Sequence, residues 1–115
     1  MANPSGRRGA EWETRCVEYL QENGFILAER RVKNGRFDRG DVSGVPGFTI
    51  EAKAERVIDL PGYLKELSEE QAHAKTAFGS VWVKNRRHGI ADGYAVRRIE
   101  DEVALMRLLD REGLL

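Results

Sequence analysis

A chain of 115 residues can form one domain around one modest hydrophobic core. Hydrophobic residues make up 41% and charged residues 33%, as in ordinary folded domains, and 19 basic side chains balance 19 acidic ones. The zero net charge argues against a protein that coats nucleic acid through overall positive charge. An enzyme that acts on DNA is still allowed, because local charge and not total charge decides contact with phosphate.

The single cysteine, Cys16, cannot form a disulfide within the chain, which is typical of a reducing compartment. The first eight residues contain no apolar run of the kind that a signal peptide needs. No stretch approaches the roughly 20 apolar residues of a membrane span. We therefore expect a cytoplasmic protein without a membrane partner.

In chain order, residues 1–9 are small, polar and basic, and we predict a flexible arm there, ahead of a folded domain over residues 10–115. Residues 10–23 have helical periodicity, which ends at the stop signal Asn23-Gly24. A strand is expected over residues 25–32, followed by a polar, glycine-containing loop over residues 33–40.

Two further strands are expected around a turn sequence, Gly44-Val45-Pro46-Gly47. A second helix is expected to begin near Pro61, with Asp59 as its N-cap. The remaining predicted elements are strands at 41–43, 48–54, 80–84 and 93–98, and helices at 61–78 and 100–111. The order α-β-β-β-α-β-β-α predicts an α/β domain with one central mixed sheet flanked by helices.

The strand over residues 48–54 carries the sharpest functional signal. Alternation places Glu51 and Lys53 together on one face, with the apolar residues 48, 50 and 52 on the other. The hairpin brings Asp41 close to Glu51, and two neighbouring carboxylates repel each other unless a cation such as Mg²⁺ lies between them. Lys53 would then orient or deprotonate water, or stabilise charge on a phosphate. The alternative is an exposed strand face with a cross-strand ion pair.

The first helix adds a third carboxylate. A helical projection places Glu13 in a row with Val17 and Leu20 on the inward side, whereas Glu11 faces outward. An inward carboxylate needs a partner, either a metal site or a buried Lys or Arg. The alternative is a partly exposed glutamate that interacts favourably with the start of the helix.

Other polar side chains are less informative. Gln71 is the polar member of an apolar stripe in the second predicted helix, and it either lines the site or bonds to nearby backbone. The two histidines, His73 and His88, have no metal-ligand spacing with Cys16, so we expect no zinc site. Cys16 itself lies in the core row of its helix and is expected to pack rather than react.

Taken together, these residues resemble a known family. Gly40-Asp41 followed by Glu51-Ala52-Lys53 resembles the D-(x)n-(D/E)-x-K signature of the PD-(D/E)XK nucleases, with Gly40 in place of the proline. Gly9, then Glu13, then Asn23-Gly24-Phe25 resemble the opening of archaeal-type Holliday junction resolvases. The start over residues 5–9 resembles that of bacteriophage-encoded relatives, and the whole resemblance extends over about residues 5–84.

The resemblance implies a restriction endonuclease-like fold and a homodimer that hydrolyses DNA phosphodiesters with Mg²⁺, for which Mn²⁺ substitutes. It implies that Asp41 and Glu51 bind the metal, that Glu13 does so directly or through water, and that Lys53 is the catalytic lysine. We expect paired cuts in four-way junctions, in the host cytoplasm if the chain is phage-encoded. The alternatives are a nuclease for flaps, mismatches or other branched or duplex DNA, and a non-catalytic DNA-binding module that keeps the fold.

Basic residues form three groups that are candidates for DNA binding. Those nearest in sequence to Asp41 are the best candidates, because they would lie over the predicted metal site and contact flanking phosphates. The alternative for each group is ordinary solvated surface. The candidates are Arg7, Arg8, Arg30, Arg31, Lys33, Arg36, Arg39, Arg86 and Arg87.

Overall fold

A single five-stranded sheet organises the part of the chain that the computed structural model describes, residues 4–32 and 37–115. The strands lie in the order β1-β2-β3-β4-β5, with β3 and β4 parallel and the other neighbours antiparallel. The elements in chain order are α1 (Pro4–Glu22), β1 (Glu29–Arg30), β2 (Val42–Ser43), β3 (Phe48–Lys53), α2 (Leu60–Ala74), β4 (Phe78–Val83), the 3₁₀ turn η2 (Ile90–Asp92), β5 (Tyr94–Val96) and α3 (Ile99–Arg111). The predicted order of elements and the mixed sheet are confirmed.

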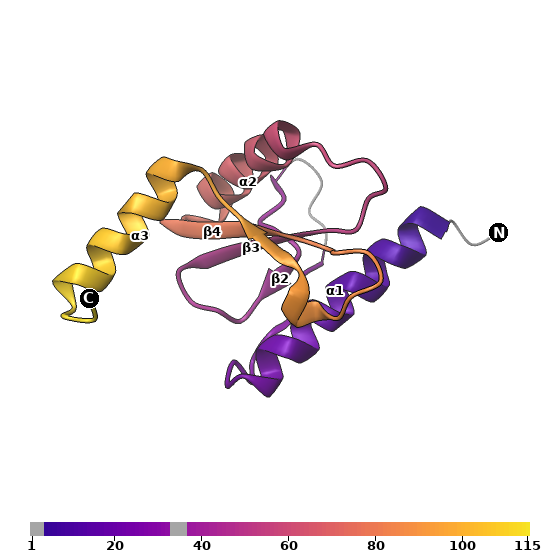
Figure 1. The fold of residues 1–115 in the computed structure, drawn as a ribbon, viewed down its shortest axis with the longest axis horizontal. Helices are drawn as coiled ribbons and strands as arrows, with labels where there is room; N and C mark the ends of the chain where they lie inside the picture. Colours follow the sequence, from indigo (N-terminus) through magenta and orange to yellow (C-terminus); the bar gives the residue numbers. More distant parts are fainter. Residues whose placement is uncertain (1–3, 33–36) are drawn as a thin grey trace.

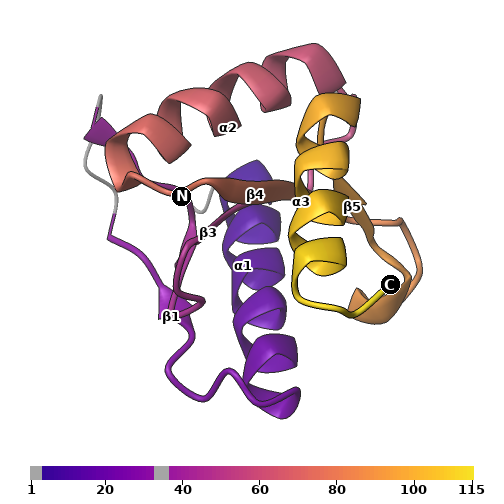
Figure 2. The same cartoon turned by 90° about the vertical axis from the view of Figure 1, so that its left-hand side faces the viewer.

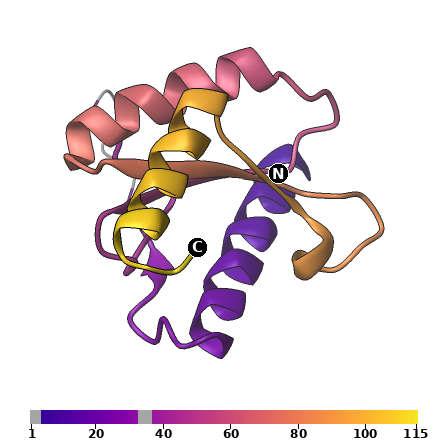
Figure 3. The same cartoon turned by 60° about the vertical axis from the view of Figure 1, so that its left-hand side comes forward.

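The helices α1 and α2 cover opposite faces of the sheet, as the three views in Figures 1, 2 and 3 agree in showing. The parallel pair β3 and β4 needs a crossover connection, and α2 provides it. Figure 1 shows α3 at one end of the molecule, beyond these three layers. The molecule is therefore a helix–sheet–helix sandwich with an additional C-terminal helix.

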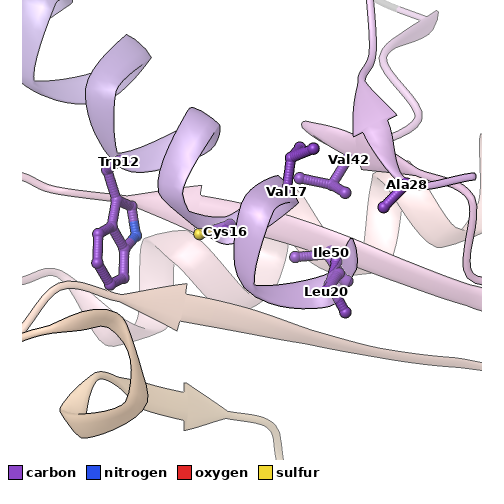
Figure 4. Close-up of a cluster of buried hydrophobic side chains, with 7 residues drawn as sticks. All are labelled: Trp12, Cys16, Val17, Leu20, Ala28, Val42 and Ile50. Carbon is purple, nitrogen blue, oxygen red and sulfur yellow. The ribbon is translucent and has the colours of Figure 1, made fainter. Parts of the chain in front are cut away.

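The main core lies between α1 and the sheet (Figure 4), and its buried members are Trp12, Cys16, Val17, Leu20, Ala28, Val42 and Ile50. The predicted inward row of α1 is thereby confirmed, and Cys16 is fully buried. The indole Nε1 of Trp12 donates a hydrogen bond to the carbonyl oxygen of Trp82 at 2.9 Å, which ties α1 to β4.

A second, smaller core lies between α2 and the sheet and consists of Tyr63, Leu67, Val81 and Val83. Because α1 covers one face of β3 and α2 covers the other, the alternating side chains of β3 go to two different environments. Ile50 packs toward α1, whereas Thr49 and Glu51 are buried polar residues on the α2 side. The polar face of β3 therefore lies beneath α2 and not in open solvent.

Several predicted boundaries need correction. The prediction of a flexible arm is wrong for residues 4–9, because α1 begins at Pro4, and proline suits a first helical position. These polar turns carry no apolar periodicity, so the sequence pattern does not reveal them. The predicted strand over residues 25–32 is reduced to Glu29–Arg30, because residues 25–28 form a turn in which the N–H of Ala28 donates to the carbonyl oxygen of Phe25 at 3.0 Å.

The end of α2 also differs from the prediction. The helix stops at Ala74 because Lys75 adopts a left-handed conformation, and the N–H of Lys75 donates to the carbonyl oxygen of Gln71. The next strand begins at Phe78, which the sequence pattern places in the helix. The predicted N-cap is confirmed, since the Asp59 side chain accepts a hydrogen bond from the N–H of Gly62 at 3.1 Å. No helix in the described ranges combines the length and the apolar character needed to cross a membrane.

Candidate functional site

A cleft of about 680 Å³ opens where the first turns of α1 meet the end of β3 and the loop before β2. All four residues that the sequence singled out, Glu13, Asp41, Glu51 and Lys53, line this cleft. They come from three separate parts of the chain, α1, the residue before β2, and β3. The structure therefore brings together the set that the spacing predicted.

Asp41 is held in place by contacts with β3. Its N–H donates to the carbonyl oxygen of Ile50 at 2.9 Å, and its Oδ2 accepts from the N–H of Ala52 at 2.8 Å. The preceding Gly40 has φ 101°, and a Cβ there would lie 2.9 Å from the carbonyl oxygen of Ile50. Proline cannot adopt this φ, so glycine at position 40 is what allows this close approach.

The carboxyl groups of Glu51 and Glu70 are both buried, each residue being 4% exposed. When both carboxyl groups are ionised, neither oxygen of Glu70 has a hydrogen-bond donor among the described residues. Burial raises the pKa of Glu51 far above its ordinary value, and the adjacent carboxyl groups of Asp41 and Glu70 raise it further. Burial also raises the pKa of Glu70; the charges of Asp38 and Asp41 add to this, while Glu51 offsets part of it.

Asp38 completes a cluster with these two glutamates. One carboxylate oxygen from each of Asp38, Glu51 and Glu70 lies within 4.8 Å of the others. Asp38 is positioned by its own loop, since its Oδ1 accepts from the N–H of Gly40 at 3.1 Å. Its carbonyl oxygen is 2.9 Å from Nδ1 of His73, so the loop is docked on α2.

This cluster fits a divalent cation. Two oxygens bound to one Mg²⁺ at about 2.1 Å lie at most about 4.2 Å apart, so only small side-chain rotations are needed. Carboxylates are the hard ligands that Mg²⁺ and Mn²⁺ prefer. A cation there would also give the buried oxygens of Glu70 the partner that they lack within the described chain.

Lys53 lies beside the acidic cluster with its charge intact. Its Nζ is 2.8 Å from Oε2 of Glu66 and 3.7 Å from Oε1 of Glu55, and it stands 5.1 Å from the centre of the Tyr63 ring. Burial lowers the pKa of Lys53, but the carboxylates of Glu66, Glu51 and Glu55 outweigh burial and raise it overall. Lys53 is therefore protonated at neutral pH.

Glu13 has a cationic partner, one of the two possibilities that the sequence left open. Its Oε2 lies 3.1 Å from a terminal nitrogen of Arg30, and its side chain is only 12% exposed. Glu11, two residues earlier, is exposed. The predicted orientation of both glutamates is confirmed, and the Glu13–Arg30 pair forms one wall of the cleft.

Two residues of the cluster were missed at the sequence level. Gln71 faces the sheet, as the stripe predicted, since its side chain lies next to Gly79 of β4, and it is not among the residues that line the cleft. Its neighbour Glu70 belongs to the acidic cluster, and the row Tyr63, Leu67, Glu70 has the helical spacing that would have revealed it. Asp38 lies in an irregular loop, where no periodicity marks it.

The predicted DNA-binding residues fall into different places. Arg8 and Arg30 line the cleft, and Arg7 is exposed on the same helix as Arg8. Arg31 and Arg39 line a separate hollow beside the turn at residues 44–47. Arg86 and Arg87 line a third hollow that adjoins the cleft, and Lys33 and Arg36 lie outside the described residues.

Comparison of the chain with protein-family models, curated proteins and solved structures gave no match. Evidence on function therefore comes from the site itself. Its distinctive features are a buried carboxylate cluster, a protonated lysine beside it, and a cleft with basic residues on its walls. This combination is suited to chemistry on an anionic substrate with the help of a cation.

Proposed function

We propose that this protein is a metal-dependent endonuclease that hydrolyses phosphodiesters of DNA. The observation that carries the proposal is the buried, unpartnered carboxylate of Glu70 beside Glu51, in a cluster with Asp38 and close to Asp41. Ionised carboxylates held this close repel one another, and either retained protons or a bound cation relieves the repulsion. A cation held by them would in turn attract the phosphate of a substrate in the adjoining cleft.

Hydrolysis adds the oxygen of water to phosphorus and breaks one ester bond, which leaves a phosphomonoester and a hydroxyl group. A divalent cation bound at the cluster would supply Lewis acidity toward the phosphoryl oxygens and lower the pKa of a bound water. Protonated Lys53 would stabilise the negative charge that develops on the phosphate. Its raised pKa favours this role over removal of a proton from water.

Other cleft residues would orient the substrate. Arg30 can contact a phosphate while Glu13 holds its guanidinium in place. Arg8 lines the same cleft from the first turns of α1. We therefore interpret Glu13 as a residue that positions Arg30, in addition to the role near the metal that the sequence resemblance implies.

Within this proposal, the chain is a PD-(D/E)XK nuclease that acts as a homodimer on four-way junctions in the cytoplasm. The motif Asp41…Glu51-Ala52-Lys53, now located in one cleft, supports the family assignment. A four-way junction has near two-fold symmetry, and two matched cuts need two active sites, so two copies of the chain are required.

Cleavage of a panel of labelled DNAs by the purified protein in Mg²⁺ tests this proposal. The panel contains a four-way junction, a flap, a mismatched duplex and a plain duplex. We expect paired cuts in the junction, no turnover by Glu51→Gln or Asp41→Asn with binding retained, and normal turnover by the matched control Glu11→Gln. If only flaps or only plain duplexes were cleaved, that DNA and not the four-way junction would be the substrate. Binding without cleavage of any DNA would indicate a non-catalytic module.

A further inference from the structure

A hollow of about 170 Å³ lies next to the catalytic cleft and is strongly basic. Its lining residues are Arg8, Ala54, Glu55, Arg56, Lys84, Arg86 and Arg87, and we call it the basic groove. Four of these, Arg8, Ala54, Glu55 and Arg56, also line the cleft, so the two hollows are continuous.

The cations of the basic groove are largely unpaired. Within the described ranges, the side chains of Arg56, Lys84, Arg86 and Arg87 make no ion pair or hydrogen bond. Other basic side chains do have acidic partners, as in the pairs Arg15–Glu18, Arg97–Glu102 and Arg98–Asp101. Since the whole chain has zero net charge, this excess of positive charge is local and not a general property of the surface.

The one acidic residue of the groove does not neutralise it. Glu55 accepts a hydrogen bond from the hydroxyl of Tyr63 at 3.1 Å and lies 3.7 Å from Nζ of Lys53. Its charge is thus directed toward the catalytic cleft. The groove is also fixed relative to the cleft, because the N–H of Lys84 donates to the carbonyl oxygen of Lys53 at 2.9 Å.

The backbone at Arg87 supports a role in binding. Its φ is 66°, in the left-handed region that residues other than glycine rarely adopt. Such strain is a reason to look for function at a position. The strained residue lies beside Arg86, so two adjacent guanidinium groups line the same hollow.

We propose that the basic groove binds the phosphates of the nucleic-acid strand that continues beyond the bond held in the cleft. This inference rests on the proposed function, since it assumes that the substrate in the cleft is a nucleic acid. Arginine side chains offer several donors to phosphate oxygens, and their contacts carry affinity without reading sequence. The groove therefore makes affinity depend on the length of strand on one side of the cleft.

The test measures binding in the absence of metal, so that cleavage plays no part. Fluorescence anisotropy of a labelled duplex in EDTA is recorded over a range of salt concentrations for wild type and Arg86→Glu/Arg87→Glu. The control is Arg15→Glu/Lys65→Glu, which changes the charge equally on exposed residues that line neither the cleft nor the groove. Circular dichroism confirms that each variant is folded.

We expect Arg86→Glu/Arg87→Glu to bind at least tenfold more weakly than the control. On duplex DNA, its slope of log affinity against log salt should be flatter by about 0.9 for each phosphate that the variant no longer neutralises. An affinity and slope equal to those of the control would overturn the inference. If Arg86→Glu/Arg87→Glu weakens binding although wild type cleaves no DNA, phosphate binding by the basic groove is supported and only the proposed endonuclease activity is refuted.

A second inference concerns α3 and is independent of the first. None of the described residues of α3 is buried, although Ile99, Val103 and Met106 recur at helical spacing on one face. Their exposed fractions are 83%, 37% and 50%. Figure 3 shows α3 lying in front of the layers in which α1, the sheet and α2 pack together.

The charges next to this apolar stripe are complementary to those of a second copy. Glu100 and Arg107 lie seven residues apart on the same flank of the stripe, and both are exposed. In an antiparallel pair of α3 helices related by a two-fold axis, each Glu100 would face Arg107 of the other copy. In a parallel pair, each Glu100 would instead face the opposite flank of the other helix, away from its Arg107. We infer that α3 packs antiparallel against α3 of a second copy of this chain.

Light scattering on the free protein tests this inference. We expect a dimer for wild type, a monomer for Val103→Asp, and a weakened dimer for Arg107→Glu. The swap Glu100→Arg/Arg107→Glu should restore the dimer, because an antiparallel two-fold pair regains opposite charges. The control is Ile26→Asp, an equally polar change on a different exposed apolar residue. The inference would be overturned if the wild type were a monomer or if the charge swap did not restore the dimer. It would also be overturned if Ile26→Asp dissociated the dimer and Val103→Asp did not.

Discussion

Glu51 of β3 and Glu70 of α2 approach one another where the helix packs on the sheet. Other residues of β3 and α2 are buried in the same interface and hold the two elements together. Leu67 and Tyr63 hold α2 against the sheet, so Glu70 cannot turn to solvent without loss of that packing. The fold therefore imposes a like-charge contact that a cation would relieve. In its absence, the raised pKa of Glu51 indicates that the pair retains a proton near neutral pH.

This contact predicts that Glu70→Gln stabilises the metal-free protein. The neutral amide removes the like charge beside Glu51 and can donate a hydrogen bond to the Glu51 carboxylate. A hydrogen bond to a charged group contributes about 1.5–3 kcal/mol, and each kcal/mol shifts the Tm of a small domain by about 4–8 °C. We expect a rise in Tm of several degrees without metal, together with loss of the stabilisation that Mg²⁺ gives to wild type. Glu69→Gln, on the exposed side of α2, is the control and should change neither quantity. An equal Mg²⁺ effect in Glu70→Gln would exclude Glu70 as a ligand.

The pH dependence of stability follows from the same pair. The folded pKa of Glu51 is raised above its ordinary value of 4.5. Its contribution to stability is therefore fully present below pH 4.5 and is lost as pH rises through the folded pKa. Metal-free wild type should lose stability between pH 5 and neutral pH, and Glu51→Gln should not show this decrease. Urea unfolding at several pH values measures it, and a stability that rises over this range would contradict the prediction.

Metal binding should release protons, because a carboxyl group must be deprotonated to coordinate a cation. We expect the affinity for Mg²⁺ to increase with pH, by about tenfold per unit where one proton is displaced. Calorimetric titrations in two buffers of different ionisation enthalpy give the number of protons released. A pH-independent affinity would mean that Glu51 is already ionised without metal.

The sequence predicted the strand face well, and the physical reason is local. Alternation along β3 depends only on the extended backbone, so Glu51 and Lys53 could be assigned to one side, with Ile50 on the other. The place of Asp41 followed from a short hairpin whose turn residues are recognisable. The Glu13 orientation followed from the helix period in the same way.

What the sequence left undetermined depends on contacts between distant segments. Glu70 and Asp38 reach the site only because α2 packs on β3 and because His73 of α2 contacts the carbonyl oxygen of Asp38. The apolar stripe on α2 drew attention to Gln71, whereas the buried row Tyr63, Leu67 and Glu70 lies beside that stripe. Helix ends shifted where a single backbone conformation, such as that of Lys75, determined them.

Glu13→Gln should lower turnover by about tenfold or more, the usual effect of removing a group that orients a functional side chain. Glu13 holds Arg30 at 3.1 Å in the cleft, and the neutral amide would hold the guanidinium less tightly. Steady-state cleavage rates are compared with those of Glu11→Gln, which changes an exposed residue on the same helix. If Glu11→Gln is the damaging change, the placement of the first helix relative to the site is wrong.

Gly40→Ala should destabilise the fold and disturb the metal site together. At φ 101°, a Cβ would lie 2.9 Å from the carbonyl oxygen of Ile50 and 3.0 Å from Cγ2 of Thr49, so the loop must move away from β3. That movement would weaken the hydrogen bonds of Asp41 to Ile50 and Ala52, which fix its carboxylate. Backbone strain of this kind reduces stability by about 1–3 kcal/mol.

The matched control is Gly47→Ala, because Gly47 also has a positive φ, of 76°, but a Cβ there would meet nothing within 4 Å. Both variants have the unfavourable φ, and only Gly40→Ala has the clash. We expect Gly40→Ala to lower Tm by several degrees more than Gly47→Ala and to weaken the stabilisation by Mg²⁺, which Gly47→Ala should retain. Equal losses in the two variants would show that the approach of this loop to β3 does not position Asp41.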